Sequence, residues 1–316
     1  MNSLAIVIPA YKSTFLRETL ESIANQTDKG FTLYIGDDCS PYDLKSIVNE
    51  FQNRINIVYH RFEENLGGEN LVAHWERCIA LTNGEPYIWL FSDDDTMDPR
   101  CVESFNSLPN HVKENSLVHF DIKMIDDLDG GKVKDLPVFP PKLSAGDYLE
   151  AKLRGKVVSY VIEFVFSRKL YDKVGGFQNF DLAWGSDFMT WLKMSAESPN
   201  GIITIENPDS YVNWRRSSEN ISPNKTRPIL LRKLKSYIEN AAFVKRELEQ
   251  SPEKYTPLNR EFRWLRFPLG EIYRNRKLLS YSDIRDLSKF YISKVGYPFQ
   301  ALSTQLVTST KKMLKK

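Results

Sequence analysis

The sequence predicts an α/β fold in which a mostly parallel central sheet is flanked by helices and followed by a helical C-terminal extension. Short apolar segments alternate with amphipathic ones nearly four times between residues 4 and 91. This alternation is typical of doubly wound parallel sheets with right-handed crossovers. Two of the apolar segments end in carboxylates, and ligands bind at the carboxyl ends of strands in such sheets. From residue 227 onward, apolar residues recur at helical spacing.

Four strands are predicted in the first part of the chain because their apolar residues form short, continuous segments. They span residues 4–8, 31–35, 55–59 and 87–91. Helices are expected between them: one that ends near Asn25, one capped by Asp43, and one over residues 71–79 that stops at Asn83-Gly84.

The pattern is looser after residue 95. Further strands are predicted at residues 116–125, 157–166, 201–205 and 211–214. Further helices are predicted at residues 144–153, at residues 168–174 and from about residue 187. A segment rich in Asp, Gly and Pro, residues 126–141, is expected to be a loop.

Charge divides the chain into two parts, residues 1–224 and residues 225–316. The first part has 22 Lys and Arg against 33 Asp and Glu, a net charge of −11, and the second has 21 against 8, a net charge of +13; they sum to the overall +2. We therefore expect an acidic domain and a basic extension that meets an anionic surface. The three cysteines lack metal-ligand spacing, and no signal peptide or membrane span is visible. A reduced, cytoplasmic setting is expected.

The segment over residues 87–99 carries the clearest functional signal. Its apolar run ends in three consecutive carboxylates, Asp93, Asp94 and Asp95. Carboxylates at the end of a buried strand are costly unless they are paired or bind a cation, and such oxygen clusters suit Mg²⁺ or Mn²⁺ with phosphate oxygens completing the shell. The alternative is a solvated acidic turn before a helix that Asp98 caps.

Seven stretches, in order along the chain, resemble the family 2 glycosyltransferases of the GT-A fold. They are Val7-Ile-Pro-Ala-Tyr11, Glu18-Thr-Leu-Glu-Ser-Ile-Ala-Asn-Gln-Thr27, Tyr34-Ile-Gly-Asp-Asp-Cys-Ser40, Glu64-Asn-Leu-Gly-Gly-Glu-Asn70, Ser92–Asp95, Gly175-Gly-Phe177 and Gly185-Ser-Asp187. The resemblance covers roughly residues 4–222. It implies a GT-A domain over residues 1–224 that moves a sugar, with inversion, from a nucleotide-diphosphate donor to a hydroxyl acceptor. A UDP-sugar donor is favoured, and cell-surface polysaccharide or glycolipid synthesis is the expected setting.

For the nucleotide, the resemblance implies that Tyr11 stacks on the base and that the backbone of Pro9 and Ala10 lines its slot. Asp38 is expected to accept a hydrogen bond from the base, with Asp37 close behind it. The alternatives are a core tyrosine and carboxylates that cap a turn before Ser40-Pro41.

Two further nucleotide-sugar contacts follow from the resemblance. Asn65 and Gly67 are expected to close their loop near the nucleotide, with a plain turn as the alternative. Many family members have a late His near the diphosphate, but the matching region here, residues 211–222, contains none. Arg216 is expected to grip the diphosphate in its place, with Arg215 as the other candidate and an ordinary surface arginine pair as the alternative.

The chemistry is expected to depend on carboxylates. Asp94 is the expected ligand of Mn²⁺ or Mg²⁺, and the metal would neutralise the departing diphosphate. Asp93 is expected to contact the ribose or the metal. Asp95 is expected to contact the donor sugar or to bond a ligand of the metal. Asp187 is the expected general base for the acceptor hydroxyl, with the role of a helix N-cap as the alternative. Ser186 stands where the family often has Glu, so a carboxylate that positions the acceptor is missing from that place.

The basic extension, residues 225–316, mixes Lys and Arg with aromatic residues and ends in Lys311-Lys312 and Lys315-Lys316. Basic amphipathic helices suit an anionic membrane, which would place the protein at the inner face of the plasma membrane beside a lipid-linked saccharide acceptor. The alternative is an appendage packed on the acidic domain, or a dimer contact. No nucleic-acid partner is expected. The alternative to an enzyme is a non-catalytic sugar-nucleotide or glycan-binding module of the same fold.

Overall fold

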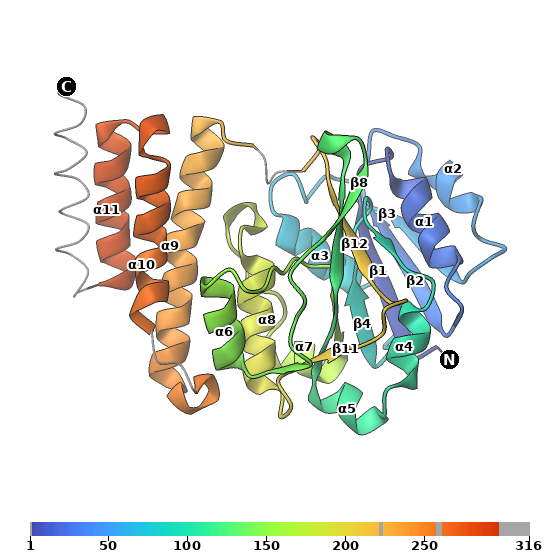
Figure 1. Ribbon diagram of the computed structural model, residues 1–316. Helices are drawn as coiled ribbons and strands as arrows, with labels where there is room; N and C mark the ends of the chain where they lie inside the picture. Colours follow the sequence, from blue (N-terminus) through green and yellow to red (C-terminus); the bar gives the residue numbers. More distant parts are fainter. Residues whose placement is uncertain (1, 221–223, 257–260, 297–316) are drawn as a thin grey trace.

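A computed structural model describes residues 2–220, 224–256 and 261–296 (Figure 1). Its central sheet has eight strands in the order β3-β2-β1-β4-β10-β6-β11-β9. The first four strands in the chain are parallel, as predicted, and they are β1 (Leu4–Ala10), β2 (Phe31–Asp37), β3 (Ile57–Arg61) and β4 (Tyr87–Leu90). The predicted helices connect them as α1 (Leu16–Ala24), α2 (Leu44–Asn49) and α3 (Leu71–Ile79).

The other half of the central sheet is mixed. Its strands are β10 (Phe164–Ser167), β6 (Leu117–Phe120), β11 (Ile202–Ile205) and β9 (Lys142–Leu143). Strand β10 runs antiparallel to both β4 and β6, so its first residue lies at the sheet edge where β4 ends. The strand predicted at residues 157–166 forms only in its last part. Before it, the backbone N–H of Tyr160 donates to the Glu163 side chain, which holds a turn in place of a strand.

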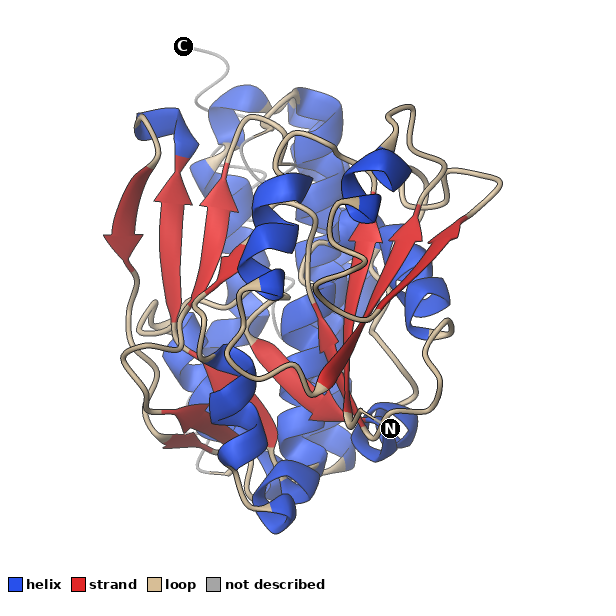
Figure 2. Cartoon of the chain, turned by 90° about the vertical axis from the view of Figure 1, so that its right-hand side faces the viewer, coloured by secondary structure: helices blue, strands red, loops and turns tan. Residues whose placement is uncertain are grey.

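A second, four-stranded sheet has the order β5-β12-β7-β8 (Figure 2). Its strands are β5 (Thr96–Met97), β12 (Val212–Arg216), β7 (Ile122–Asp126) and β8 (Lys132–Asp135). The strand predicted at residues 116–125 is therefore divided between two sheets. The expected loop at residues 126–141 contains the 3₁₀ turn η1 (Asp127–Asp129) and strand β8, because β8 pairs with β7 in a hairpin.

The alternation of side chains along β1 explains how the central sheet is buried. Ala5 and Val7 belong to one core, whereas Leu4, Ile6 and Ile8 belong to the core on the other face. Helices cover both faces, and those of the middle region are α4 (Cys101–Ser107), α5 (Asn110–Asn115), α6 (Ala145–Leu153), α7 (Arg168–Val174) and α8 (Ser186–Glu197). A continuous apolar strand between two helical layers is the pattern that the sequence predicts.

The C-terminal extension is helical, as predicted, and its helices lie side by side next to α6 and α8 (Figure 1). Its elements are α9 (Arg227–Gln250), η3 (Pro252–Tyr255), α10 (Glu261–Arg274), η4 (Arg276–Leu278) and α11 (Tyr281–Val295). Leu234, Ile238 and Tyr291 belong to the core of this bundle. Phe243 and Trp264, in contrast, join the core that also holds α6 and α8. The extension is therefore packed on the first domain.

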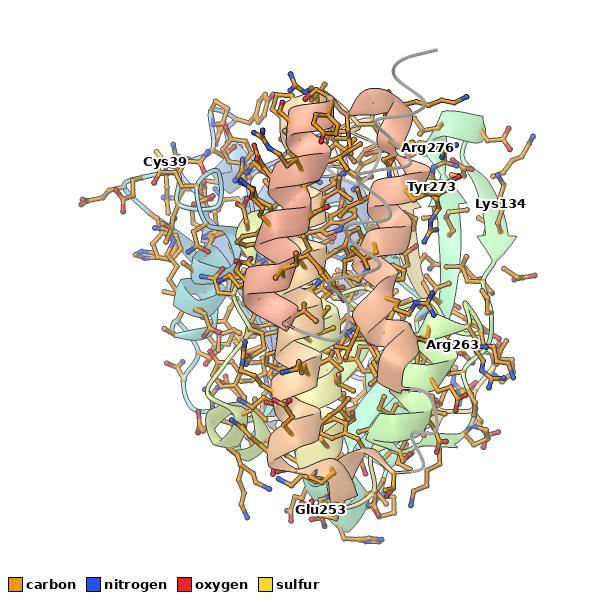
Figure 3. The ribbon with its side chains drawn as sticks, turned by 90° about the vertical axis from the view of Figure 1, so that its left-hand side faces the viewer. Cys39, Lys134, Glu253, Arg263, Tyr273 and Arg276 are labelled. Atoms are coloured by element: carbon orange, nitrogen blue, oxygen red, sulfur yellow. The ribbon has the colours of Figure 1, made fainter. Side chains whose placement is uncertain are left out.

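Part of the basic charge of the extension is already paired. Arg232 bonds Asp181 at 2.6 and 2.8 Å, and Lys254 bonds Glu197 at 2.5 Å, so both reach acidic residues of the first domain. Exposed positions such as Arg263 and Tyr273 lie on the outer side of α10 (Figure 3). No described helix is both long and apolar enough to cross a membrane. The terminal lysines, residues 311–316, lie outside the described part of the chain.

Candidate active site

The carboxyl ends of β1, β2 and β4 meet at one edge of the central sheet, as the sequence predicts. The backbone N–H groups of Tyr11 and Lys12 donate to the same oxygen of Asp93 at 2.8 and 2.7 Å. The backbone N–H of Asp38 donates to the carbonyl of Ala10 at 2.9 Å. Residues from three separate strand ends are thereby fixed against one another.

The three consecutive carboxylates are buried, with 4%, 4% and 3% of Asp93, Asp94 and Asp95 exposed. Burial raises the pKa of Asp93 and of Asp95, and the neighbouring Asp94 carboxylate raises both further. Asp95 accepts hydrogen bonds from the Ser92 hydroxyl at 2.5 Å and from the Arg215 backbone N–H at 2.6 Å. The solvated acidic turn considered above is therefore excluded.

Asp98 does not cap a helix. Helix α4 begins at Cys101 with Arg100 as its N-cap residue. The Asp98 carboxylate instead accepts from the Tyr211 backbone N–H and the Asn213 amide, each at 3.3 Å. These hydrogen bonds attach the segment after Asp95 to β12. The pairing of β5 with β12 attaches it further.

Lys12 supplies a positive charge to the acidic residues. Its ammonium lies 3.3 Å from the Asp93 carboxylate and also bonds Asp94. Burial alone would lower the pKa of Lys12, but the Asp93 and Asp94 charges outweigh it and raise that pKa. Asp94 also accepts from the Ser92 hydroxyl at 2.8 Å and from the Asn220 amide at 3.3 Å. The position beside the Asp94 carboxylate therefore favours a positive charge, which the Lys12 ammonium provides.

A divalent cation fits this position only in part. Within residues 2–220, 224–256 and 261–296, no group of three or more His, Cys, Asp or Glu side chains is arranged to hold a metal. The carboxylate of Asp94 offers a hard oxygen ligand where the Lys12 ammonium now lies. Such a donor set suits a cation that takes its other ligands from phosphate oxygens and water.

On the nucleotide side, Tyr11 is 38% exposed, so its ring is accessible at the sheet edge. Asp37, in contrast, is fully buried and engaged. It accepts from the Ser40 backbone N–H at 2.8 Å, from Arg61 at 2.8 Å and from the Tyr59 hydroxyl. Asp37 therefore holds the turn after β2, which is the alternative that the sequence left open for it.

Asp38 holds the loop that contains Asn65 and Gly67. Its two oxygens accept from the backbone N–H groups of Leu66 at 2.9 Å and Gly67 at 2.8 Å, and Arg77 also bonds it. A Cβ at Gly67 would lie 2.5 Å from Asp38, so glycine is required there. Asn65 accepts from the Gly68 backbone N–H at 2.7 Å. Contacts of this loop with a nucleobase stay a prediction.

An open hollow of about 590 Å³ lies beside the end of β2. Its lining includes Ser40, Tyr42, Tyr59 and Arg61. Asp93, Asp94 and Asp95 are not among its lining residues, but the Ser40 hydroxyl donates to the Tyr11 carbonyl at 2.6 Å. The hollow therefore adjoins the turn that holds Tyr11, and Asp37 bonds three of its lining residues, Ser40, Tyr59 and Arg61.

Asp187 lies in the first turn of α8, and Gly185 is the N-cap residue of that helix. Asp187 is therefore not the N-cap. Burial raises its pKa, and the nearby Lys152 ammonium opposes that rise. A carboxylate with a raised pKa is a better proton acceptor while it stays ionised.

The extension supports the start of α8. Gly185 has a φ of +84°, and a Cβ there would lie 2.2 Å from the Asn240 amide. That amide donates to the Trp184 carbonyl at 3.1 Å. Leu182 and Ala183, just before, also adopt left-handed backbone angles. Helix α9 therefore holds a strained segment next to Asp187.

Tyr160 links the two halves of the site. Its ring stacks on Trp214 of β12 at a centroid distance of 4.2 Å. Burial raises the pKa of Tyr160, and the Glu163, Asp187 and Asp95 charges raise it further. The Trp191 indole of α8, the helix that carries Asp187, donates to the Tyr160 carbonyl at 2.8 Å, so Tyr160 connects β12 with α8.

Sequence reasoning missed Glu163, Lys152 and Lys12. The sequence shows each of them only as a single charged residue next to apolar or turn residues. Their burial arises from contacts between distant segments, which the sequence does not show. Burial raises the pKa of Glu163 to about 8, and burial lowers the pKa of Lys152.

The two late arginines have different surroundings. Arg215 is 3% exposed and bonds the Asp94 carbonyl at 2.7 Å and the Asp127 carboxylate at 3.0 Å. Arg216 is exposed and pairs with Asp126 at 3.2 Å. Of the two, Arg216 has the more exposed guanidinium. Its contact with a diphosphate stays a prediction.

The large mixed sheet with helices on both faces is a GT-A type of fold, as in nucleotide-sugar transferases of known structure. S. aureus TarS 1-349 in complex with UDP-GlcNAc has a TM-score of 0.56 at 15% identity, covering 98% of this chain and 89% of that chain. The mannosyltransferase PcManGT from Pyrobaculum calidifontis, solved with GDP-Man and Mn²⁺, has a TM-score of 0.55 at 14% identity, covering 98% and 86%. At these identities, the likeness concerns the fold.

Residues 5–127 match the model described as glycosyl transferase family 2. A GalNAc(5)-diNAcBac-PP-undecaprenol beta-1,3-glucosyltransferase from Campylobacter jejuni is 23% identical over 261 residues, 80% of this chain and 78% of that protein. The Staphylococcus aureus poly(ribitol-phosphate) beta-N-acetylglucosaminyltransferase TarS is 31% identical over 98 residues, 30% of this chain and 16% of that protein. Together these findings support a family 2 glycosyltransferase.

Proposed function

We propose that this protein is an inverting glycosyltransferase that moves a sugar from a nucleotide-diphosphate donor to a hydroxyl of a saccharide or lipid-linked saccharide. The observation that carries the proposal is the meeting of the ends of β1, β2 and β4 at one sheet edge, where the buried Asp93, Asp94 and Asp95 lie. Tyr160 connects β12, beside these carboxylates, with α8, the helix that carries Asp187. The three consecutive carboxylates lie on the side on which nucleotides bind in such folds, and Asp187 lies in the first turn of α8.

Asp187 is the general base of the proposed reaction. It takes the proton of an acceptor hydroxyl while that oxygen attacks the anomeric carbon of the donor sugar. The bond from that carbon to the diphosphate oxygen breaks, its electron pair leaves with the diphosphate, and the configuration inverts. The raised pKa of Asp187 suits this proton transfer. The nearby Lys152 ammonium opposes the rise of that pKa and so favours the ionised form.

The departing diphosphate is stabilised by positive charge. Lys12 follows β1 and bonds Asp94, and Arg216 of β12 follows Arg215, whose backbone N–H donates to Asp95. Both cations suit phosphate oxygens. A divalent cation held by Asp94, when bound, supplies Lewis-acid neutralisation of the leaving group. Asp93 keeps the turn after β1 in place through the Tyr11 and Lys12 backbone N–H groups.

We assign catalysis to residues 1–224 and support of the Asp187 segment to residues 225–316. The name of the Campylobacter jejuni relative describes a lipid-linked acceptor, and this supports a lipid-linked saccharide acceptor here. The UDP-GlcNAc bound to TarS supports a UDP-sugar donor. A contact between the extension and an anionic membrane at the inner face of the plasma membrane is also part of this proposal.

The proposal is tested with Asp187→Asn, and Asp172→Asn on the surface of α7 is the matched control. Transfer of labelled sugar from UDP-GlcNAc, UDP-glucose and GDP-mannose to p-nitrophenyl hexosides is measured beside nucleotide binding. We expect Asp187→Asn to lower kcat about 10²–10⁴-fold, because a general base contributes that much, and to leave the Kd for the nucleotide within about threefold. Nucleotide binding by the wild type without transfer would favour the non-catalytic module instead.

A further inference from the structure

Glu163 is a carboxylate that the mechanism above does not use. Its side chain is 0% exposed. Its Oε1 accepts from the Tyr160 backbone N–H at 2.6 Å, and its Oε2 is buried without a hydrogen-bond partner in the protein. A buried polar atom without a partner is costly, so this oxygen is suited to a partner that a ligand brings.

The position of Glu163 places it at the reacting edge of the sheet. It directly precedes β10, whose Val165 pairs with Trp89 of β4 in antiparallel register. Glu163 therefore lies beyond the carboxyl end of β4, from which the acidic residues emerge. Its backbone is fixed there, because the Phe120 backbone N–H donates to the Glu163 carbonyl at 2.9 Å.

The segment before β10 connects Glu163 to the candidate base. The Trp191 indole of α8, the helix that carries Asp187, donates to the Tyr160 carbonyl at 2.8 Å. Lys152 of α6 donates to the Ser159 hydroxyl at 2.8 Å. The charges of Lys152 and Asp187 both act on the Glu163 carboxyl group. Two carboxyl groups and one ammonium are thus gathered around the segment before β10.

We propose that Glu163 is an acceptor-positioning residue, whose free Oε2 hydrogen-bonds an acceptor hydroxyl next to the one that Asp187 deprotonates. The proposal rests on the proposed function and adds the class of acceptor to it. A site with two carboxyl groups and the Tyr160–Trp214 aromatic pair suits a sugar ring with neighbouring hydroxyls, because aromatic faces take its apolar side. Glu163 thereby provides the carboxylate that Ser186 does not.

The test compares Glu163→Gln with Glu163→Met. Glutamine keeps the bond from the Tyr160 backbone N–H and changes only the free end, whereas methionine fills similar volume without hydrogen bonding. Glu85→Gln is the matched control. Glu85 is 8% exposed, accepts from the Tyr34 hydroxyl at 2.6 Å and also has a buried, unpartnered Oε2. It precedes β4 and so lies at the opposite edge of the sheet.

The acceptor probes are the p-nitrophenyl hexosides to which the wild type transfers, and their monodeoxy analogues. We expect Glu163→Gln and Glu163→Met to raise the acceptor KM about tenfold or more, since losing a hydrogen bond to a buried carboxyl group has effects of that order. The Kd for UDP, the slow hydrolysis of the donor without acceptor, and the Tm of Glu163→Gln at pH 5 should stay close to wild type. Glu85→Gln should leave the acceptor KM unchanged.

The deoxy analogues give the sharper result. One analogue should bind the wild type about tenfold more weakly, and on that analogue Glu163→Gln should cause no further loss, because the shared hydrogen bond is already absent. Equal losses on every analogue, or an unchanged acceptor KM in folded variants, would overturn the role of Glu163 and leave the transferase function standing. Failure of the wild type to transfer to any hexoside, with UDP bound, would count against the proposed function itself and against this role with it.

Discussion

Replacing Lys12 with Met removes the positive charge that now lies on the acidic residues. The Lys12 ammonium is 3.3 Å from Asp93 and also bonds Asp94, and its side chain is 26% exposed. A divalent cation at Asp94 has to displace this ammonium or share the carboxylate with it. We therefore expect Lys12→Met to bind free Mn²⁺ more tightly than the wild type.

The size of the effect follows from the geometry. Two unit charges at 3.3 Å interact by about 5 kcal/mol at an effective dielectric constant of about 20. The desolvation of the ammonium and the ordering of its side chain oppose most of that gain. A net coupling of about 1–2 kcal/mol remains, which corresponds to roughly five- to thirtyfold tighter binding of Mn²⁺.

The assay is calorimetric titration of Mn²⁺ into nucleotide-free protein. Lys12→Arg keeps the charge and should behave like the wild type. Lys29→Met removes a lysine that bonds the Ala24 carbonyl before β2, far from the acidic residues, and should also leave Mn²⁺ binding unchanged. Equal or weaker Mn²⁺ binding by a folded Lys12→Met variant would refute the competition between ammonium and metal.

Three further predictions concern stability and the placement of the base. Burial raises the pKa of Glu163 from 4.5 to about 8. The protonated side chain therefore contributes its full stability below pH 4.5, and this contribution is lost as the pH rises through 8. In thermal melts, the Tm of Glu163→Gln relative to that of the wild type should increase from about pH 5 to about pH 8.5. Gly146→Ala should destabilise the fold by about 1–3 kcal/mol in urea titrations, because its Cβ would lie 2.2 Å from the Tyr255 carbonyl oxygen, whereas Gly270→Ala, with open space around it, should not. Asn240→Ala should lower kcat about tenfold and leave the Kd for UDP unchanged in calorimetry, because it removes the hydrogen bond to the Trp184 carbonyl beside the Asp187 segment. An unchanged kcat would show that α9 does not help to position Asp187.

The parallel half of the fold is predictable from the sequence because its signals are local. The apolar run Leu4–Ile8 becomes a strand buried on both faces, and the side chain of Asp43 caps α2 as predicted. The C-terminal helices follow from their apolar spacing in the same way. In each case, a short stretch of chain contains the whole pattern.

Features that arise from pairing between distant segments are less readable. Asp121 separates β6 from β7, and the two strands enter different sheets because one pairs with β11 and the other with β12. The continuous apolar pattern of residues 116–125 does not contain that choice. Asp98 has the sequence position of a cap, yet the pairing of β5 with β12 directs it to Tyr211.

The candidate site divides in the same manner. The convergence of the strand ends is predictable because parallel strands place their carboxyl ends at one edge. Glu163 and Lys12 become notable only when burial and partners are known. Asp37 and Asp38 have the expected position, but their oxygens bond the protein's own donors, which the residue types alone do not disclose.

Calorimetric titration of UDP, GDP and dTDP, with and without Mn²⁺, into wild type and Asp94→Asn tests the central claim most directly. We predict that one nucleotide, UDP by preference, binds more tightly with Mn²⁺ and that Asp94→Asn loses this Mn²⁺ dependence, because Asp94 supplies the hard oxygen ligand. Folded protein that binds none of the three nucleotides would contradict a nucleotide-sugar site at this edge of the sheet.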